Sequence, residues 1–187
     1  LLEVAGTPKP GNVDRERDLS DLRFEHFLAG AVGAGRGLRA AESGAPVGEA
    51  FERAVAGMSR QEGDNTQFGA LLLLVPLVRA ASGDGELTPD AATAAAVEAT
   101  TVDDAANFYR AFEHVDVFVD DPPADAAELD VRRGADAVPA VEERGTTLAE
   151  VMALSAPGDG VAREWTTGFE RAFDGAAKIL TTSDELL

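Results

Sequence analysis

The sequence predicts an all-α protein, a single-domain multi-helix bundle around a central apolar helix. The first observation is the stretch 63–78, GDNTQFGALLLLVPLV, in which a polar, glycine-flanked turn leads into residues that are apolar on every side. A helix of that kind is buried all round. The second is that helical three-and-four spacing of apolar residues recurs along the chain. The third is that residues 117–119 resemble a short strand, but no nearby segment could pair with them convincingly.

The central helix carries its own start signal. Asn65 or Thr66 can act as N-cap, because a short side-chain oxygen accepts a hydrogen bond from a backbone N–H two or three residues on. The apolar run that follows, residues 70–76, is too short to cross a bilayer. The N-terminus of such a helix attracts a phosphate or carboxylate. An ordinary capped core helix is the alternative.

The other elements follow from caps and spacing. Gly30, Gly33, Gly35 and Gly37 in one helix lower its propensity and should let another helix approach closely. Residues 120–145 are rich in Pro, Asp and Gly, and we expect a long ordered loop or lid there. Helices are expected at 1–5, 18–41, 48–58, after the turn at 63–69, from Pro89 to about 100, from 101 onward, at 147–154 behind a capping box, and at 161–180 behind Asp159.

Composition limits the function. The 187 residues suit one domain, and the absence of cysteine excludes disulfides and thiolate metal sites. With 34 acidic against 16 basic residues the net charge is −18, which disfavours nucleic acid and anionic membranes as partners. Such an acidic, lysine-poor composition is typical of a salt-loving cytoplasm, where screening makes the charge tolerable. The ends, Leu1 and TTSDELL, suggest truncation on both sides.

One of the two lysines lies in a stiff loop, TPKPGNVD, at residues 7–14. Pro8 and Pro10 restrict the backbone around Lys9, and Gly11 permits a tight turn or the close approach of a ligand. A lysine held in this way suits phosphate binding as a compact point charge. A plain turn is the simpler alternative.

Acidic residues follow this loop at helical spacing. If a helix begins by Asp18, then Asp18, Asp21 and Glu25 share one face, and together with Asp14 they form an oxygen-only cluster. Such a cluster suits Mg²⁺, which is commonly held by one or two carboxylates together with substrate phosphates. A solvated acidic face is the alternative in a protein of this composition.

Two segments together resemble a known family. Residues 3–14, EVAGTPKPGNVD, with residues 63–69, GDNTQFG, resemble the triphosphoribosyl-dephospho-CoA synthase family, which makes the prosthetic-group precursor of citrate lyase and malonate decarboxylase. Residues 159–173, DGVAREWTTGFERAF, look like the later region of archaeal relatives. The combination of TPKPG with NT-x-x-G at this spacing is specific, whereas either motif alone would be weak.

The resemblance implies an all-helical, ATP-binding, cytoplasmic transferase that joins the triphosphoribosyl group of ATP to the 2′-hydroxyl of 3′-dephospho-CoA and releases adenine. A homo-oligomer is left open. Carboxylates would stabilise the oxocarbenium ion and act as base. For catalysis the resemblance implies Glu3, Asp14, Asp18 and Asp21. For binding the nucleotide and its phosphates it implies Lys9, Asn12, Asn65, Thr66 and Arg163, with Arg132 or Arg133. For binding magnesium it implies Asp14, Asp18 and Asp21.

The second motif departs from the family pattern. Bacterial members read NTHKG, whereas Gln67 and Phe68 stand here in place of the histidine and lysine. Two potential phosphate contacts are lost and an exposed or ligand-facing ring is expected. The acceptor can therefore differ from that of the bacterial enzymes. Non-catalytic nucleotide binding and a purely structural helical subunit remain alternatives.

Overall fold

The computed structural model describes residues 1–119, 122 and 124–184, and within these ranges it contains helices and no strand. The all-α prediction is confirmed. In chain order the elements are α1 (Leu2–Gly6), α2 (Phe24–Glu42), α3 (Val47–Met58), α4 (Phe68–Ala81), α5 (Pro89–Glu98), α6 (Val102–Ala111), the 3-10 segments η1 (Ala124–Leu129) and η2 (Val131–Ala137), α7 (Val138–Arg144), α8 (Leu148–Ser155), α9 (Gly160–Thr166) and α10 (Glu170–Asp184). No helix in the described part of the chain has the length and apolarity needed to cross a membrane.

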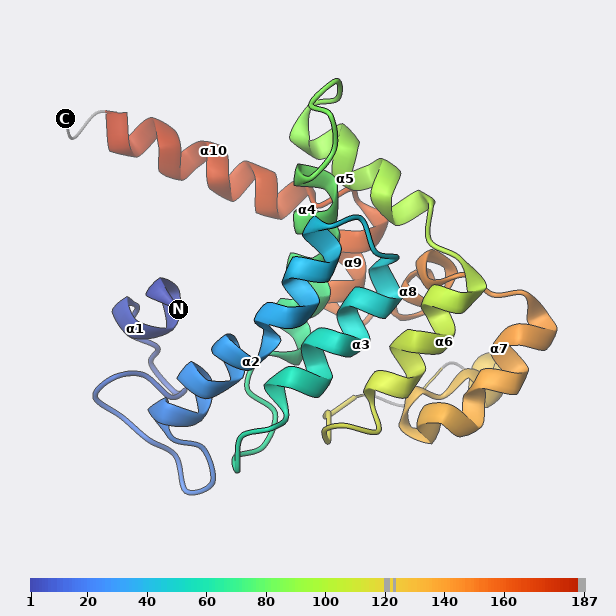
Figure 1. Cartoon of the computed structure of the whole chain (residues 1–187), viewed down its shortest axis with the longest axis horizontal. Coiled ribbons are helices and arrows are strands. Elements are labelled where there is room, and N and C mark those ends of the chain that lie inside the picture. Colours follow the sequence, from blue (N-terminus) through green and yellow to red (C-terminus); the bar gives the residue numbers. More distant parts are fainter. Residues whose placement is uncertain (120–121, 123, 185–187) are drawn as a thin grey trace.

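Helices α2, α3 and α4 pack against one another, and α6, α8 and α9 pack around them (Figure 1). The central helix α4 buries Phe68, Leu71, Leu72 and Val75, so its place in the core is confirmed. It is not buried on every side, however, because Leu74 is 43% exposed. The prediction was wrong on that point because the bundle leaves one stripe of α4 uncovered.

Proline within α4 has a partner that compensates for it. Pro76 has no N–H, so the carbonyl of Leu72 loses its intrahelical donor. The indole N–H of Trp165 in α9 donates to that carbonyl over 3.1 Å. A buried carbonyl without a donor is costly, so this bond fixes the face of α4 on which α9 packs.

Glycines set the distance between α2 and α3, as predicted for three of the four. A Cβ at Gly33 would overlap the carbonyl of Gly57, and a Cβ at Gly57 would overlap the carbonyl of Gly33. One turn further on, a Cβ at Gly37 would overlap the backbone of Ala54. Gly30 faces the turn before α4. Gly35 differs, because its Cβ would meet only the side chain of Arg39 in the same helix.

Helix starts agree with their capping signals at several points. Thr101 and Asp104 form a capping box at α6, and Thr147 and Glu150 form one at α8. Asp104 is 3% exposed, and its second carboxylate oxygen accepts the N–H of Gly48 in α3 over 2.7 Å. One carboxylate therefore caps two helices.

The expected helix over 161–180 is broken. Asp159 caps α9 as predicted, but the chain turns at Gly168 (φ 66°) and Phe169 (φ 63°) before α10 begins. Phe169 is fully buried, and Glu164 accepts the N–H of Ala172 in the first turn of α10 over 3.0 Å. Burial of the phenylalanine and this cap together offset a left-handed conformation that a straight helix would have avoided.

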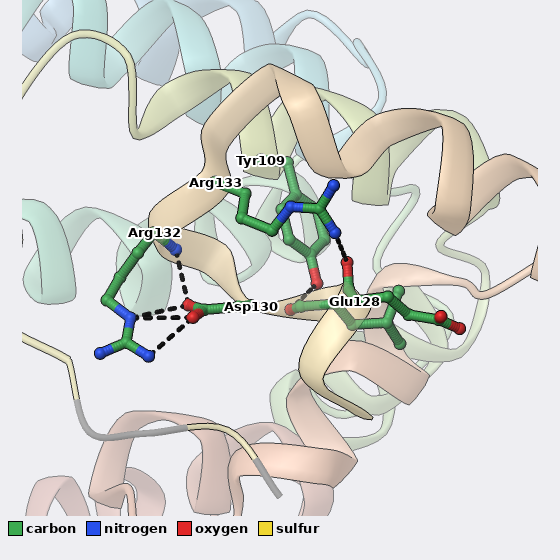
Figure 2. A network of polar contacts seen from close by, with 6 residues as sticks. Tyr109, Glu128, Asp130, Arg132 and Arg133 are labelled. Carbon is green, nitrogen blue, oxygen red and sulfur yellow. Dashed lines mark hydrogen bonds and ion pairs between the residues drawn. The ribbon is translucent and has the colours of Figure 1, made fainter. Parts of the chain in front are cut away.

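Residues 120–145 are also more structured than the predicted loop or lid. Apart from residues 120, 121 and 123, which lie outside the description, they form η1, η2 and α7. Figure 2 shows how polar contacts hold them: the buried Tyr109 hydroxyl donates to the Leu129 carbonyl over 2.6 Å, and Asp130 pairs with Arg132. Burial raises the pKa of Tyr109, so its hydroxyl stays protonated. Tyr109 therefore has a packing role.

The glycine contacts give the first prediction. Gly33→Ala should lower the free energy of unfolding by about 1–3 kcal/mol, because the methyl group meets a backbone carbonyl that cannot move independently. Gly35→Ala is the matched control and should raise it by roughly 0.5–1 kcal/mol through helix propensity alone. Urea unfolding followed by circular dichroism measures both, and equal effects would contradict the packing argument.

Candidate functional site

The first motif is a turn closed on itself by backbone hydrogen bonds. The N–H of Asn12 donates to the carbonyl of Lys9 over 2.9 Å. The carboxylate of Asp14 accepts the N–H of Lys9 over 3.0 Å and the N–H of Glu16 over 2.9 Å. Val13, between them, is 1% exposed and anchors the turn in a small apolar cluster. The prolines and glycine thus form an ordered loop, as predicted.

The electrostatics of Asp14 follow from this geometry. The backbone N–H of Lys9, with that of Glu16, holds the pKa of Asp14 below its ordinary value. The group is therefore a stable anion and a weak base. Of the two roles expected for the carboxylates, charge stabilisation suits Asp14 better than proton abstraction.

The second motif is held onto the start of α4 and onto α2. The N-cap of α4 is Gln67, not Asn65 or Thr66 as expected, because α4 begins only at Phe68. The side-chain oxygen of Asn65 nevertheless accepts the N–H of Phe68, the first helical residue, over 3.0 Å. The side-chain amide of Gln67 donates to the carbonyl of Phe27 over 2.8 Å, and the Thr66 hydroxyl donates to the Gln67 oxygen over 2.7 Å. A Cβ at Gly30 would overlap both side chains, so the glycine makes this approach possible.

The two motifs meet at Phe27. Its ring lies in the cluster with Val4 and Val13, and the ammonium of Lys9 lies 5.9 Å from the ring centroid. Its carbonyl accepts the bond from Gln67. Figure 1 shows α1, the N-terminal loop, the beginning of α2 and the turn before α4 on the same side of the bundle. The two motifs therefore lie close together, with Phe27 as the shared contact.

The acidic residues do not share a helix face. Helix α2 begins at Phe24, and Asp18 precedes it and accepts the N–H of Phe24 over 2.9 Å. Asp21 lies exposed in the turn between them. The helical-face argument was wrong because the chain uses Asp18 as a cap from outside the helix. Among the described residues, no three acidic or histidine side chains form a group that could hold a metal ion. Asp14, Asp18 and Asp21 are thus not assembled into a three-carboxylate site.

The arginines expected as anion clamps lie elsewhere. Arg132 is bound by the carboxylate of Asp130, with contacts of 2.9 Å from Nε and 2.7 Å from Nη2. Arg133 donates to the carbonyl of Glu128 over 2.9 Å (Figure 2). Both therefore hold the η1–η2 segment together. Arg163 is exposed on α9, whose main packing partners are α8 and α4. The side chain of Glu3, in α1, lies outside the described residues.

Some residues at the motif junction were not predicted to belong to it. The side chain of His26 accepts the N–H of Arg23 over 3.2 Å, and a Cβ at Gly63 would overlap the histidine ring. Gly63, the first residue of the second motif, thus allows the motif to approach α2. This glycine was the available signal, whereas nothing in the local sequence distinguished Phe27 from other core aromatics.

Phe68, the first residue of α4, is a core residue that also lines a cavity. Its ring is 4% exposed and packs against Phe51 and Phe112 with centroid distances of 5.1 and 4.8 Å. The expected exposed ring is thus corrected to a core ring, because α4 directs it between α3 and α6. Phe68 and Gly69 also line a cavity of about 500 Å³ whose other walls come from α6, from described residues of the 112–131 segment, and from α8 and α9.

The fold and the paired motifs define an all-α protein whose candidate site joins a lysine-bearing loop to a helix N-terminus. Comparison with known families makes this more specific. The chain belongs to the CitG family, ATP:dephospho-CoA triphosphoribosyl transferase, whose family model matches residues 1–185. The family is one of transferases, and the predicted resemblance is confirmed.

A solved structure supports the same assignment. The chain resembles a protein from Archaeoglobus fulgidus for which triphosphoribosyl-dephospho-CoA synthase activity has been proposed, with 28% sequence identity and a TM-score of 0.63. The match covers 83% of this chain and 62% of that one, so the chain spans less than two thirds of its neighbour's length. No curated protein matches the chain.

The Asp14 turn gives the second prediction. Because its folded-state pKa is lowered, the carboxylate stabilises the protein above the ordinary pKa of 3.8, and this contribution disappears as pH falls through the lowered value. Asp14→Asn should therefore be less stable than the parent at pH 7, and the difference should shrink below pH 3.8. Urea unfolding across this range measures it. Asp116→Asn, at an exposed site after α6, is the control, and a difference that persists at low pH would refute the explanation.

Proposed function

We propose that this chain carries the triphosphoribosyl transfer of its family: ATP donates the group to the 2′-hydroxyl of 3′-dephospho-CoA or a related acceptor, and adenine leaves. Family membership over residues 1–185 supports the reaction class. The observation that carries the proposal is the junction at Phe27, where the Lys9 loop and the turn before α4 contact the ring and the carbonyl of one residue.

The reaction requires two changes at one carbon atom. The bond from C1′ of the ATP ribose to N9 of adenine breaks with its electron pair going to adenine, and the acceptor 2′-oxygen forms the new bond to C1′. The acceptor hydroxyl gives its proton to a base, and adenine takes up a proton as it leaves. Positive charge grows on C1′, so a nearby fixed carboxylate lowers the barrier.

The junction offers suitable groups for the triphosphate. Lys9 supplies a positive charge at the loop, and Asn12 and Thr66 supply polar side chains. The first-turn N–H groups of Gly69 and Ala70 have no carbonyl within α4 to donate to, and the helix dipole adds to their attraction for phosphate. Asn65 holds the first turn in place. Arg163, exposed on α9, is a further member of the proposed set.

The carboxylates divide by environment. Asp14, with both oxygens on backbone N–H groups, is the fixed negative charge. Asp21 is exposed and is the better candidate for base or metal ligand, and Glu3 in α1 remains a second candidate base. An oxygen donor such as Asp21 fits a magnesium ion that arrives with ATP, because Mg²⁺ is commonly held by one or two carboxylates and the substrate phosphates. Such an ion would offset the phosphate charge; Asp14 and Asp18 are its other proposed neighbours.

A non-catalytic nucleotide-binding protein is the alternative, and a transferase with another acceptor is a third. One observation favours both alternatives. Gln67 donates a hydrogen bond to Phe27 and the ring of Phe68 packs against Phe51, at the two positions where the bacterial motif NTHKG has histidine and lysine. The acidic surface supports a further proposal, that the protein works in the salty cytoplasm of an archaeal-type cell.

The third prediction tests turnover. With ATP, Mg²⁺ and 3′-dephospho-CoA in concentrated potassium chloride, the protein should release free adenine, detected by chromatography. Lys9→Ala should lower the rate at least tenfold through loss of a charge near the phosphates. Lys178→Ala, which removes the only other lysine, on the exposed surface of α10, is the control and should leave it unchanged. Nucleotide binding without adenine release would support the non-catalytic alternative.

The fourth prediction concerns Asp21. Asp21→Asn should lower kcat by about 10²-fold or more if the carboxylate is the base, while the free energy of unfolding changes by less than about 0.5 kcal/mol because the side chain is exposed. The acidic limb of the pH–rate profile should also disappear. Asp116→Asn is again the control. An unchanged kcat would assign the base to another carboxylate.

A further inference from the structure

We propose that the cavity beside the second motif binds the pantetheine arm of the acceptor, the flexible chain of amides ending in a thiol. The inference rests on the proposed function, since the family description names dephospho-CoA. It extends that function by assigning a separate site to the uncharged end of the acceptor, on the face of α4 that does not contact Phe27.

The size and lining of the cavity suit such an arm. Its volume is about 500 Å³, within the range of small-molecule sites. Leu72, Phe108, Met152 and Val161 contribute apolar walls from four different helices. The arm is long, narrow and uncharged, so its methylene and methyl groups can be buried here at little electrostatic cost in a protein of net charge −18.

Polar groups lie where amides could use them. Asp130 and Ser155 line the cavity alongside the apolar residues. Asp130 is already paired with Arg132, whose guanidinium lowers the pKa of the carboxyl group and keeps it an acceptor for N–H donors. A few fixed polar atoms within an apolar wall orient a flexible ligand.

The position of the cavity connects it to the nucleotide end. Gln67 contacts Phe27, whereas the next two residues, Phe68 and Gly69, line the cavity. The motif junction and the cavity are therefore formed by consecutive residues at the start of α4. A diphosphate near the helix N-terminus would place its attached arm beside this cavity. A Cβ at Gly69 would lie 3.5 Å from Val161, an ordinary van der Waals contact, so α4 and α9 lie close together at this part of the cavity wall.

The inference is tested by comparing 3′-dephospho-CoA with ADP, which is the same nucleotide without the arm. Calorimetry should show dephospho-CoA binding at least tenfold more tightly. Leu154→Trp, at a 40% exposed residue on the cavity wall, should abolish this difference and leave the ADP affinity unchanged. Leu74→Trp, at a 43% exposed leucine of α4 that does not line the cavity, is the matched control and should keep the difference.

A second variant and a second signal guard against misfolding. Gly158 lines the same cavity, and a Cβ at this position would have no heavy atom within 4 Å. The variant Gly158→Leu should therefore fold and should also remove the difference in affinity between dephospho-CoA and ADP. In the parent protein, Trp165 is the only tryptophan and bonds to the carbonyl of Leu72, on the cavity wall. Pantetheine alone should therefore change its fluorescence, whereas ADP should not.

The outcomes separate this inference from the proposed reaction. Adenine release with equal affinities for dephospho-CoA and ADP overturns the arm site and leaves the transfer. A retained arm effect without adenine release leaves the site and overturns the transfer. No binding of dephospho-CoA, or full arm binding by folded Leu154→Trp and Gly158→Leu proteins, overturns the inference.

Discussion

The close approach of α2 to its neighbours is the constraint on which the rest of the structure depends. Gly33 and Gly57 bring the backbones of α2 and α3 so near that neither position has room for a side chain. About one turn before Gly33 in α2, the missing side chain of Gly30 leaves room for the side chains of Thr66 and Gln67. The spacing that packs the core thus also fixes the second motif against α2. Cores are close-packed and transmit small changes, so packing and site geometry are linked here.

Backbone groups that helices leave without partners are a second theme. Pro76 removes a donor from α4 and Trp165 replaces it, which joins α9 to the central helix. The carboxylate of Asp104 accepts the N–H of Thr101 at the start of α6 and the N–H of Gly48 at the start of α3. These bonds lie between elements far apart in sequence. They set orientations that apolar contact alone, being non-directional, would leave loose.

The candidate site combines side chains that hold its loops in shape with charged side chains that lie in the same turns. Asp14 and Asn65 are committed to backbone N–H groups and hold their loops in shape. Lys9 is half-buried in its turn and Asp21 is exposed. Rigid loops that carry charged side chains bind phosphate without a large ordering cost. Gln67 and Phe68 of the second motif both make contacts inside the protein, so this part of the motif supports the fold.

Local signals alone determined much of this protein. The all-α class, the starts of α6 and α8 and the ordered Lys9 loop follow from spacing, capping oxygens and proline, because each depends on neighbours within a few residues. Tertiary structure decided what depends on distant partners. The break at Phe169 exists because its ring is buried in the core, Asp18 caps α2 from outside the helix, and Arg132 pairs with Asp130 within an ordered segment. Only the folded chain shows that both motifs meet at Phe27, since packing across the bundle brings together residues that no local pattern connects.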